Sequence, residues 1–149
     1  DVVAPLYKCN MTDIMAAIGL VQLRRYPELL ARRYDMVRQY DAKLPGEVLR
    51  PAHLRSDMTS DCHLYLARLP GKTHESRSEI ITRMAERGVA CNVHYKPLPL
   101  LTAYKNLGFR MVDYPNAYAQ FENEITLPLH TLLSDEDIDY VCACLKESL

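Results

Sequence analysis

The first third of the chain repeats apolar side chains with the period of a helix. Thr12 can cap a helix start, and the apolar positions after it recur at i, i+3, i+4 and i+7, as Ile14, Ala17, Ile18 and Val21. Pro27 predicts a break after this helix, and a second helix is expected over residues 28–44. The first helix is apolar around most of its circumference, so it needs a large partner surface.

Short strand patterns alternate with short helix patterns in the rest of the chain. Strands are predicted over residues 63–69, 89–93 and 125–129, with Pro128 stopping the last of them or placing it at a sheet edge. Helices are predicted from Ser76 to Gly88, over 99–108, over 115–123 and from Ser134 onward, where Ser76 and Ser134 are the expected caps.

This order of elements predicts an α/β (α+β) architecture in two parts. Residues 1–45 form a helical arm, and residues 46–149 form a small α/β domain with about three short strands and four helices. The arm is too apolar to stand alone, which indicates further chain or a second subunit beside it.

Three side chains capable of chemistry follow the predicted strand at 89–93. His94, Tyr95 and Lys96 offer a base, a phenol and a cation, and Pro97 favours an extended backbone at Lys96. Functional sites are often built at strand ends. A hydrogen-bonded structural histidine and a core tyrosine would show the same pattern, so the pattern alone leaves both interpretations open.

Charge and hydropathy exclude two classes of partner. The 18 Lys and Arg against 19 Asp and Glu leave a net charge of -1, which gives no electrostatic case for nucleic acid or an anionic membrane. No apolar run is long enough to span a bilayer. The arginines between Arg24 and Arg38 could bind phosphate, but a solvated helix face explains them better.

The cysteines predict a reducing compartment, the cytoplasm. There are five of them, which cannot all pair, and they lack the spacing of a disulfide scaffold. Cys142 and Cys144 lie two positions apart on a predicted helix and so point roughly 200° away from each other. We therefore predict that they are packing or surface residues and form no metal site.

Several segments, in order, resemble the DegT/StrS family of nucleotide-sugar aminotransferases. The similarity begins with the run from Tyr7 to Leu23, YKCNMTDIMAAIGLVQL. It continues through His63-Leu64-Tyr65, Glu86-Arg87-Gly88-Val89, Val93-His94-Tyr95-Lys96-Pro97-Leu98, Leu127-Pro128-Leu129-His130 and Ser134-Asp135-Glu136-Asp137. The resemblance covers nearly the whole chain.

The resemblance implies a C-terminal portion of a fold-type-I, pyridoxal-phosphate-dependent homodimer. Such enzymes transfer an amino group from glutamate, or sometimes glutamine, to the keto sugar of a nucleotide-sugar. The cofactor lysine and the carboxylate facing the pyridine nitrogen would lie upstream of Asp1, so no lysine of this chain takes that role and the chain carries no catalytic residue. Alone, it should be inactive.

The resemblance also carries over four site residues. Lys8 and Asn10 match a loop that reaches the cofactor phosphate and substrate of the neighbouring subunit. His94 and Tyr95 match a segment that lines the sugar-nucleotide pocket. The alternative function is a non-catalytic α/β interaction module that has kept the aminotransferase fold.

Overall fold

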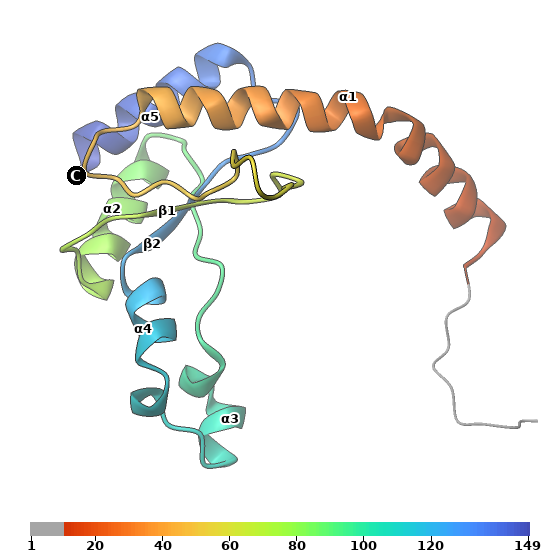
Figure 1. Ribbon diagram of the computed structural model, residues 1–149. Coiled ribbons are helices and arrows are strands. Elements are labelled where there is room, and N and C mark those ends of the chain that lie inside the picture. Colours follow the sequence, from red (N-terminus) through yellow and green to blue (C-terminus); the bar gives the residue numbers. More distant parts are fainter. Residues whose placement is uncertain (1–10) are drawn as a thin grey trace, which may run out of the picture.

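The computed structural model describes residues 11–149 as five α-helices, two short 3-10 helices and two strands (Figure 1). In chain order these are α1 (Asp13–Lys43), β1 (Tyr65–Arg68), α2 (His74–Glu86), η1 (Leu98–Leu100), α3 (Thr102–Asn106), η2 (Met111–Asp113), α4 (Pro115–Glu122), β2 (Glu124–Leu127) and α5 (Asp135–Ser148). The expected mixture of helices with a short sheet, preceded by a helical arm, is confirmed.

Helix α1 is one helix where the sequence predicted two. The Thr12 side chain caps its start by accepting from the Met15 amide, as expected. Pro27 lies inside the helix, so the predicted break there was wrong. A proline removes one backbone hydrogen bond and pushes on the preceding turn, which bends a long helix without ending it when the turns on both sides persist. Figure 1 shows the N-terminal part of α1 bent away from the rest.

Strands β1 and β2 pair antiparallel, with Tyr65 opposite Leu127 and Arg68 opposite Glu124. The third predicted strand, 89–93, was wrong. That segment makes a single bridge, in which Asn92 and Thr126 exchange both backbone hydrogen bonds. One bridged residue is too short for a strand, but it still gives β2 a neighbour on its second edge. On the other edge of the sheet, Leu49 bridges Arg68.

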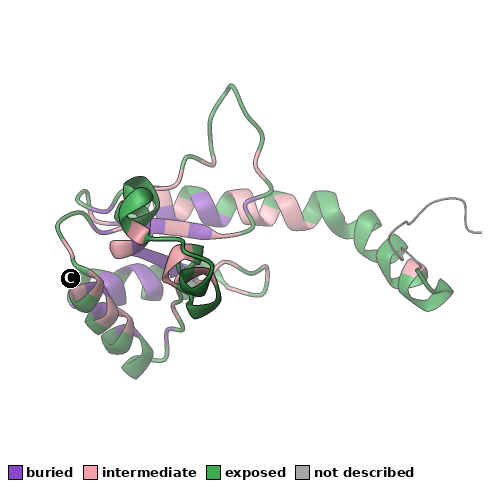
Figure 2. Ribbon diagram, turned by 90° about the horizontal axis from the view of Figure 1, so that it is seen from below, coloured by how far each residue is buried: buried purple, intermediate pink, exposed green. Residues whose placement is uncertain are grey.

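The core lies where the C-terminal half of α1, helices α2 and α5, and the sheet meet (Figure 2). Its largest fully buried side chains include Tyr40 and Tyr65, whose ring centroids are 4.7 Å apart. The Tyr40 hydroxyl donates to the Pro128 carbonyl at 2.7 Å, and the Tyr65 hydroxyl donates to the Asp41 carboxylate. Two tyrosines thus join α1 to β1 and to the residue that follows β2.

Two helix starts were predicted with different success. Ser134 caps α5, and Asp137 returns a hydrogen bond to the Ser134 amide, which confirms the expected cap. Helix α2 begins earlier than expected, because Thr73 and Ser76 form the capping box and Ser76 is its third helical residue. The Ser76 pattern fitted the same rule one turn too late.

The N-terminal half of α1 projects from the body of the molecule (Figures 1 and 2). Most of its apolar side chains are exposed in the part of the chain that the structure describes, among them Ile14, Met15, Ile18, Leu20, Val21 and Leu23. Nothing lies within 4 Å of the Cβ position of Gly19. Although this half is rich in apolar residues, no helix among residues 11–149 is long and apolar enough to cross a membrane.

We expect Tyr40→Phe to destabilise the fold by about 1–2 kcal/mol, because it removes the hydroxyl that pairs with the Pro128 carbonyl inside the core. The control is Tyr140→Phe. Tyr140 also donates to a backbone carbonyl, that of Arg87, but it is 53% exposed, and water can replace its bond. Urea unfolding followed by circular dichroism measures both variants, and equal losses would contradict the tethering role of Tyr40.

Candidate functional site

The candidate site is the segment after Asn92, which covers the polar face of β2. All four residues of β2 are buried. Ile125 and Leu127 point into the apolar core, and since side chains alternate along a strand, Glu124 and Thr126 face the other way. The bridge between Asn92 and Thr126 places the following residues against this second face.

A chain of three hydrogen bonds joins β2 to His94. One carboxylate oxygen of Glu124 (Oε2) accepts from the His94 amide at 3.1 Å, and the other (Oε1) lies 2.7 Å from the Thr126 hydroxyl. The same hydroxyl oxygen lies 2.9 Å from Nδ1 of the His94 ring. The backbone and the ring of His94 are therefore both fixed by β2.

Glu124 is an unusually buried carboxylate. It is 1% exposed, and burial raises its pKa above the ordinary glutamate value, while the hydrogen bonds from Thr126 and the His94 amide oppose part of that rise. Arg77, also buried, lends a weaker opposing charge but forms no ion pair with Glu124. Its guanidinium stacks on the Phe121 ring and donates to the Phe121 carbonyl.

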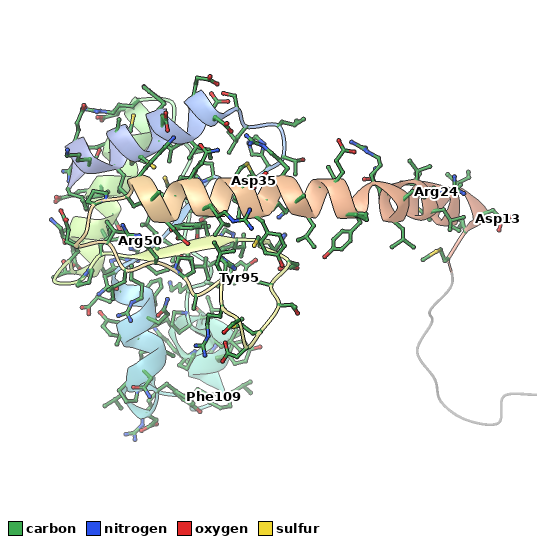
Figure 3. All side chains as sticks on the ribbon, turned by 45° about the horizontal axis from the view of Figure 1, so that its top comes forward. Asp13, Arg24, Asp35, Arg50, Tyr95 and Phe109 are labelled. Atoms are coloured by element: carbon green, nitrogen blue, oxygen red, sulfur yellow. The ribbon has the colours of Figure 1, made fainter. Side chains whose placement is uncertain are left out.

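His94 and Tyr95 lie together, as the sequence predicted. Their rings meet edge to face with centroids 4.6 Å apart. Tyr95 is 74% exposed, which rules out the core tyrosine of the alternative interpretation, and Figure 3 labels it on the connection that leads from α2 past the sheet to α3. The histidine is hydrogen-bonded as a structural histidine would be, yet it holds an exposed phenol at the surface.

A hollow of about 250 Å³ opens beside this segment, where Lys96 meets the start of α2 and helices α3 and α4. It is lined by His74, Glu75, Lys96, Leu100, Lys105, Tyr118 and Phe121. The lining contains two lysines and a histidine but one carboxylate, together with two aromatic rings. Such a lining favours an anionic ligand with a flat or apolar part.

The cysteine in the same stretch has no nucleophilic role. Burial raises the pKa of the Cys91 thiol to about 12, and burial likewise raises the pKa of Cys142 to about 11. A thiol is reactive as the thiolate, so both stay protonated and inert at neutral pH. This agrees with a packing role for Cys142, which the sequence predicted to be a packing or surface residue.

Lys8 and Asn10, the predicted cofactor contacts, lie outside the described residues. Of the lysines between residues 11 and 149, Lys43 pairs with Asp139, Lys72 donates to the Leu149 carbonyl, and the remaining three are exposed on the surface.

The arginine cluster of α1 is only partly a solvated face. Arg32 bonds to Asp135 at 2.6 Å and to the Leu133 carbonyl at 2.5 Å, and Arg33 donates to the Cys62 carbonyl at 2.9 Å. These two side chains tie α1 to the start of α5 and to the loop before β1. Arg24, Arg25 and Arg38 are exposed, as predicted.

Comparison with solved structures defines the class of protein. The fold matches the C-terminal part of fold-type-I aminotransferases. A Streptococcus pneumoniae protein named "Putative sugar aminotransferase Spr1654", in its apo form, is 58% identical with a TM-score of 0.95, and the match covers 99% of this chain and 37% of that one. Its PLP form is 56% identical with a TM-score of 0.92, covering 100% and 39%.

The chain belongs to the DegT/DnrJ/EryC1/StrS aminotransferase family, whose sequence pattern matches residues 4–146. The spore coat polysaccharide biosynthesis protein SpsC of Bacillus subtilis is 32% identical over 153 residues, which cover 99% of this chain and 39% of SpsC. The resemblance seen in the sequence is thereby confirmed. The chain spans less than half the length of these relatives.

Sequence reasoning missed Glu124 and Thr126. Thr126 was read only as part of the predicted strand 125–129, and Glu124 fell between that strand and the helix before it, although a carboxylate is rarely buried as Glu124 is. The available signal was the alternation along residues 124–127, which puts Glu124 and Thr126 on one face and Ile125 and Leu127 on the other.

The raised pKa of Glu124 predicts how stability depends on pH. The folded chain holds the Glu124 proton more tightly than the unfolded chain, whose glutamates titrate near 4.5. Its stabilising contribution is therefore complete below that value and is lost as pH rises through the raised pKa. Glu124→Gln has no carboxyl to titrate at this position, so this loss should disappear. Urea unfolding from about pH 4 to about pH 8 should therefore show a difference in the free energy of unfolding between wild type and Glu124→Gln that changes with pH.

Glu122→Gln is the matched control for this measurement, because Glu122 lies two residues earlier and is partly exposed. It should keep the wild-type dependence on pH. If wild type instead gains stability over Glu124→Gln as pH rises, the direction assigned to the pKa of Glu124 is wrong.

Proposed function

We propose that this chain is the C-terminal part of a pyridoxal-phosphate-dependent sugar aminotransferase. The complete enzyme would transfer an amino group from glutamate, or glutamine, to the keto sugar of a nucleotide-sugar, in the cytoplasm. Family membership supports the reaction class, and one observation supports a substrate-binding role for this chain. His94 and the exposed Tyr95 are held together against β2, and the next residue, Lys96, lines a hollow together with Lys105.

His94 and Tyr95 form a wall for the sugar-nucleotide in this proposal. An imidazole and a phenol can each make a hydrogen bond to a sugar hydroxyl, and Lys96 and Lys105 suit a diphosphate. The cofactor, when bound in the complete enzyme, supplies the electron sink for the transfer. The residues of this chain bind and orient the substrate, and none of them needs to move a proton.

Lys8 and Asn10 have the second role, in which a cation and an amide donor reach the cofactor phosphate of a neighbouring subunit. Such a role for Lys8 and Asn10 requires a homodimer. The exposed apolar side chains of α1, from Ile14 to Leu23, support an assembly in which further protein covers this helix. A large domain in the same chain and a second subunit both fit that need.

Because the cofactor lysine would lie outside this chain, residues 1–149 alone should not hold pyridoxal phosphate. We expect borohydride treatment of the chain with the cofactor to leave no lysine modified above the level of an unrelated control protein, as read by peptide mass spectrometry. A single lysine labelled stoichiometrically would contradict the proposal. A reading frame that continues upstream into a large domain would support it.

In the complete protein, His94→Ala and Tyr95→Phe should impair use of the nucleotide-sugar. Each removes one hydrogen-bonding group from the wall, so we expect KM for that substrate to rise about threefold to tenfold, with the cofactor absorbance unchanged. His130→Ala is the control, since His130 is an exposed histidine away from this segment. Loss of cofactor binding equal to loss of substrate binding would count against the wall.

A further inference from the structure

The hydrogen-bond chain from Glu124 to His94 has a direction, and that direction decides which ring nitrogen of His94 carries the proton. The His94 amide can only donate, so Oε2 of Glu124 must be an acceptor. The direction of the remaining hydrogen bonds is therefore set at Oε1, which lies 2.7 Å from the Thr126 hydroxyl.

A threonine hydroxyl has one proton to donate. When Glu124 is ionised, Oε1 can only accept, so Thr126 gives its proton to Glu124. The Thr126 oxygen is then left with lone pairs towards His94, and Nδ1, at 2.9 Å, must be the donor. A neutral His94 ring then has its proton on Nδ1 and a free lone pair on Nε2, which bonds to no other group among residues 11–149.

The opposite state is equally well defined. A protonated Glu124 donates from Oε1 to Thr126, Thr126 donates to Nδ1, and the ring proton moves to Nε2. The two states differ in what the histidine offers its surroundings. In the first, Nε2 accepts a hydrogen bond, and in the second it donates one.

We propose that Glu124 is a positioning residue for His94, whose carboxylate acts through Thr126 to fix the imidazole proton on Nδ1 and so presents Nε2 to the substrate as a hydrogen-bond acceptor. The contact of Nε2 with substrate rests on the proposed function, in which His94 faces a sugar-nucleotide. The group that Nε2 accepts from is then a sugar hydroxyl or an N–H of the ligand.

Several charges surround this arrangement. Burial raises the pKa of Glu124, while the hydrogen bonds from Thr126 and the His94 amide, the charge of His94 when protonated and the charge of Arg77 on α2 favour the ionised carboxylate. The His94 ring forms no ion pair with a carboxylate among residues 11–149, and its ring hydrogen bond is to Thr126. The protonation of the two ring nitrogens is therefore determined by the hydrogen bond to Thr126 of β2.

Replacement of Glu124 by glutamine should reverse the direction of the hydrogen bonds from residue 124 through Thr126 to His94. The glutamine oxygen must take the place of Oε2, because the His94 amide needs an acceptor, and this leaves the NH2 group facing Thr126. Thr126 then accepts from the glutamine and donates to Nδ1. Glu124→Gln should thus move the His94 proton to Nε2 with almost no change of shape.

The test reads the ring nitrogens directly. Long-range 1H–15N correlation spectra of the 15N-labelled chain, recorded at about pH 8 where ordinary imidazoles are neutral, distinguish protonated from unprotonated ring nitrogens. His94→Gln assigns the signals. Wild type, Glu122→Gln and Thr126→Ser, which keeps the hydroxyl, should show the proton on Nδ1, and Glu124→Gln should show it on Nε2.

A proton on Nε2 in wild type, or no change in Glu124→Gln, overturns the proposal and leaves the proposed function untouched. In the complete protein, Glu124→Gln should then raise KM for the nucleotide-sugar about threefold to tenfold with kcat and cofactor absorbance unchanged. A moved proton without a change in KM, in an enzyme that His94→Ala impairs, would refute the acceptor role of Nε2. If His94→Ala itself has no effect, the substrate wall is wrong, and the proton position stands on the spectra alone.

Discussion

The structure depends on the complete burial of β2. A strand of a small sheet usually has one wet face, but here the residues that alternate with Ile125 and Leu127 are also shut away from water. A buried carboxylate and a buried hydroxyl must find partners, because leaving either unpaired costs about 1–3 kcal/mol or more. The segment after Asn92 supplies those partners. The hydrogen bonds that satisfy the buried side chains of Glu124 and Thr126 are therefore the same bonds that position His94.

The same reasoning explains how α1 is held. In its C-terminal half, the Tyr40 hydroxyl donates to the Pro128 carbonyl and Asp41 accepts from Tyr65 of β1, while Arg32 and Arg33 fix its polar side. Its N-terminal half makes no such contacts within residues 11–149 and carries apolar side chains on most sides. One continuous helix thus joins a packed body to a projecting half whose apolar side chains are exposed.

The sequence predicted the elements that local chemistry determines. Ser134 and Thr12 were recognised as caps, and β1, β2 and α5 were found because their patterns are periodic and have clear ends. Two elements failed for tertiary reasons. Pro27 bends α1 without ending it, and residues 89–93 alternate like a strand but only Asn92 finds a partner on β2. Pairing across the fold is not visible in local alternation.

The candidate site also combines features that local sequence signals indicate with features that depend on tertiary contacts. His94 and Tyr95 could be proposed from the sequence because their residue types and the following proline are local signals, whereas the contact with Glu124 needs two segments about 30 residues apart to meet. A histidine at a protein surface can take either tautomer at little difference in free energy, so a single directed hydrogen bond decides between them. A buried carboxylate is well suited to supply that direction, since it is shielded from water and its neighbours on β2 cannot move without breaking the sheet. Specificity at the exposed face can therefore be set by a residue that no substrate touches.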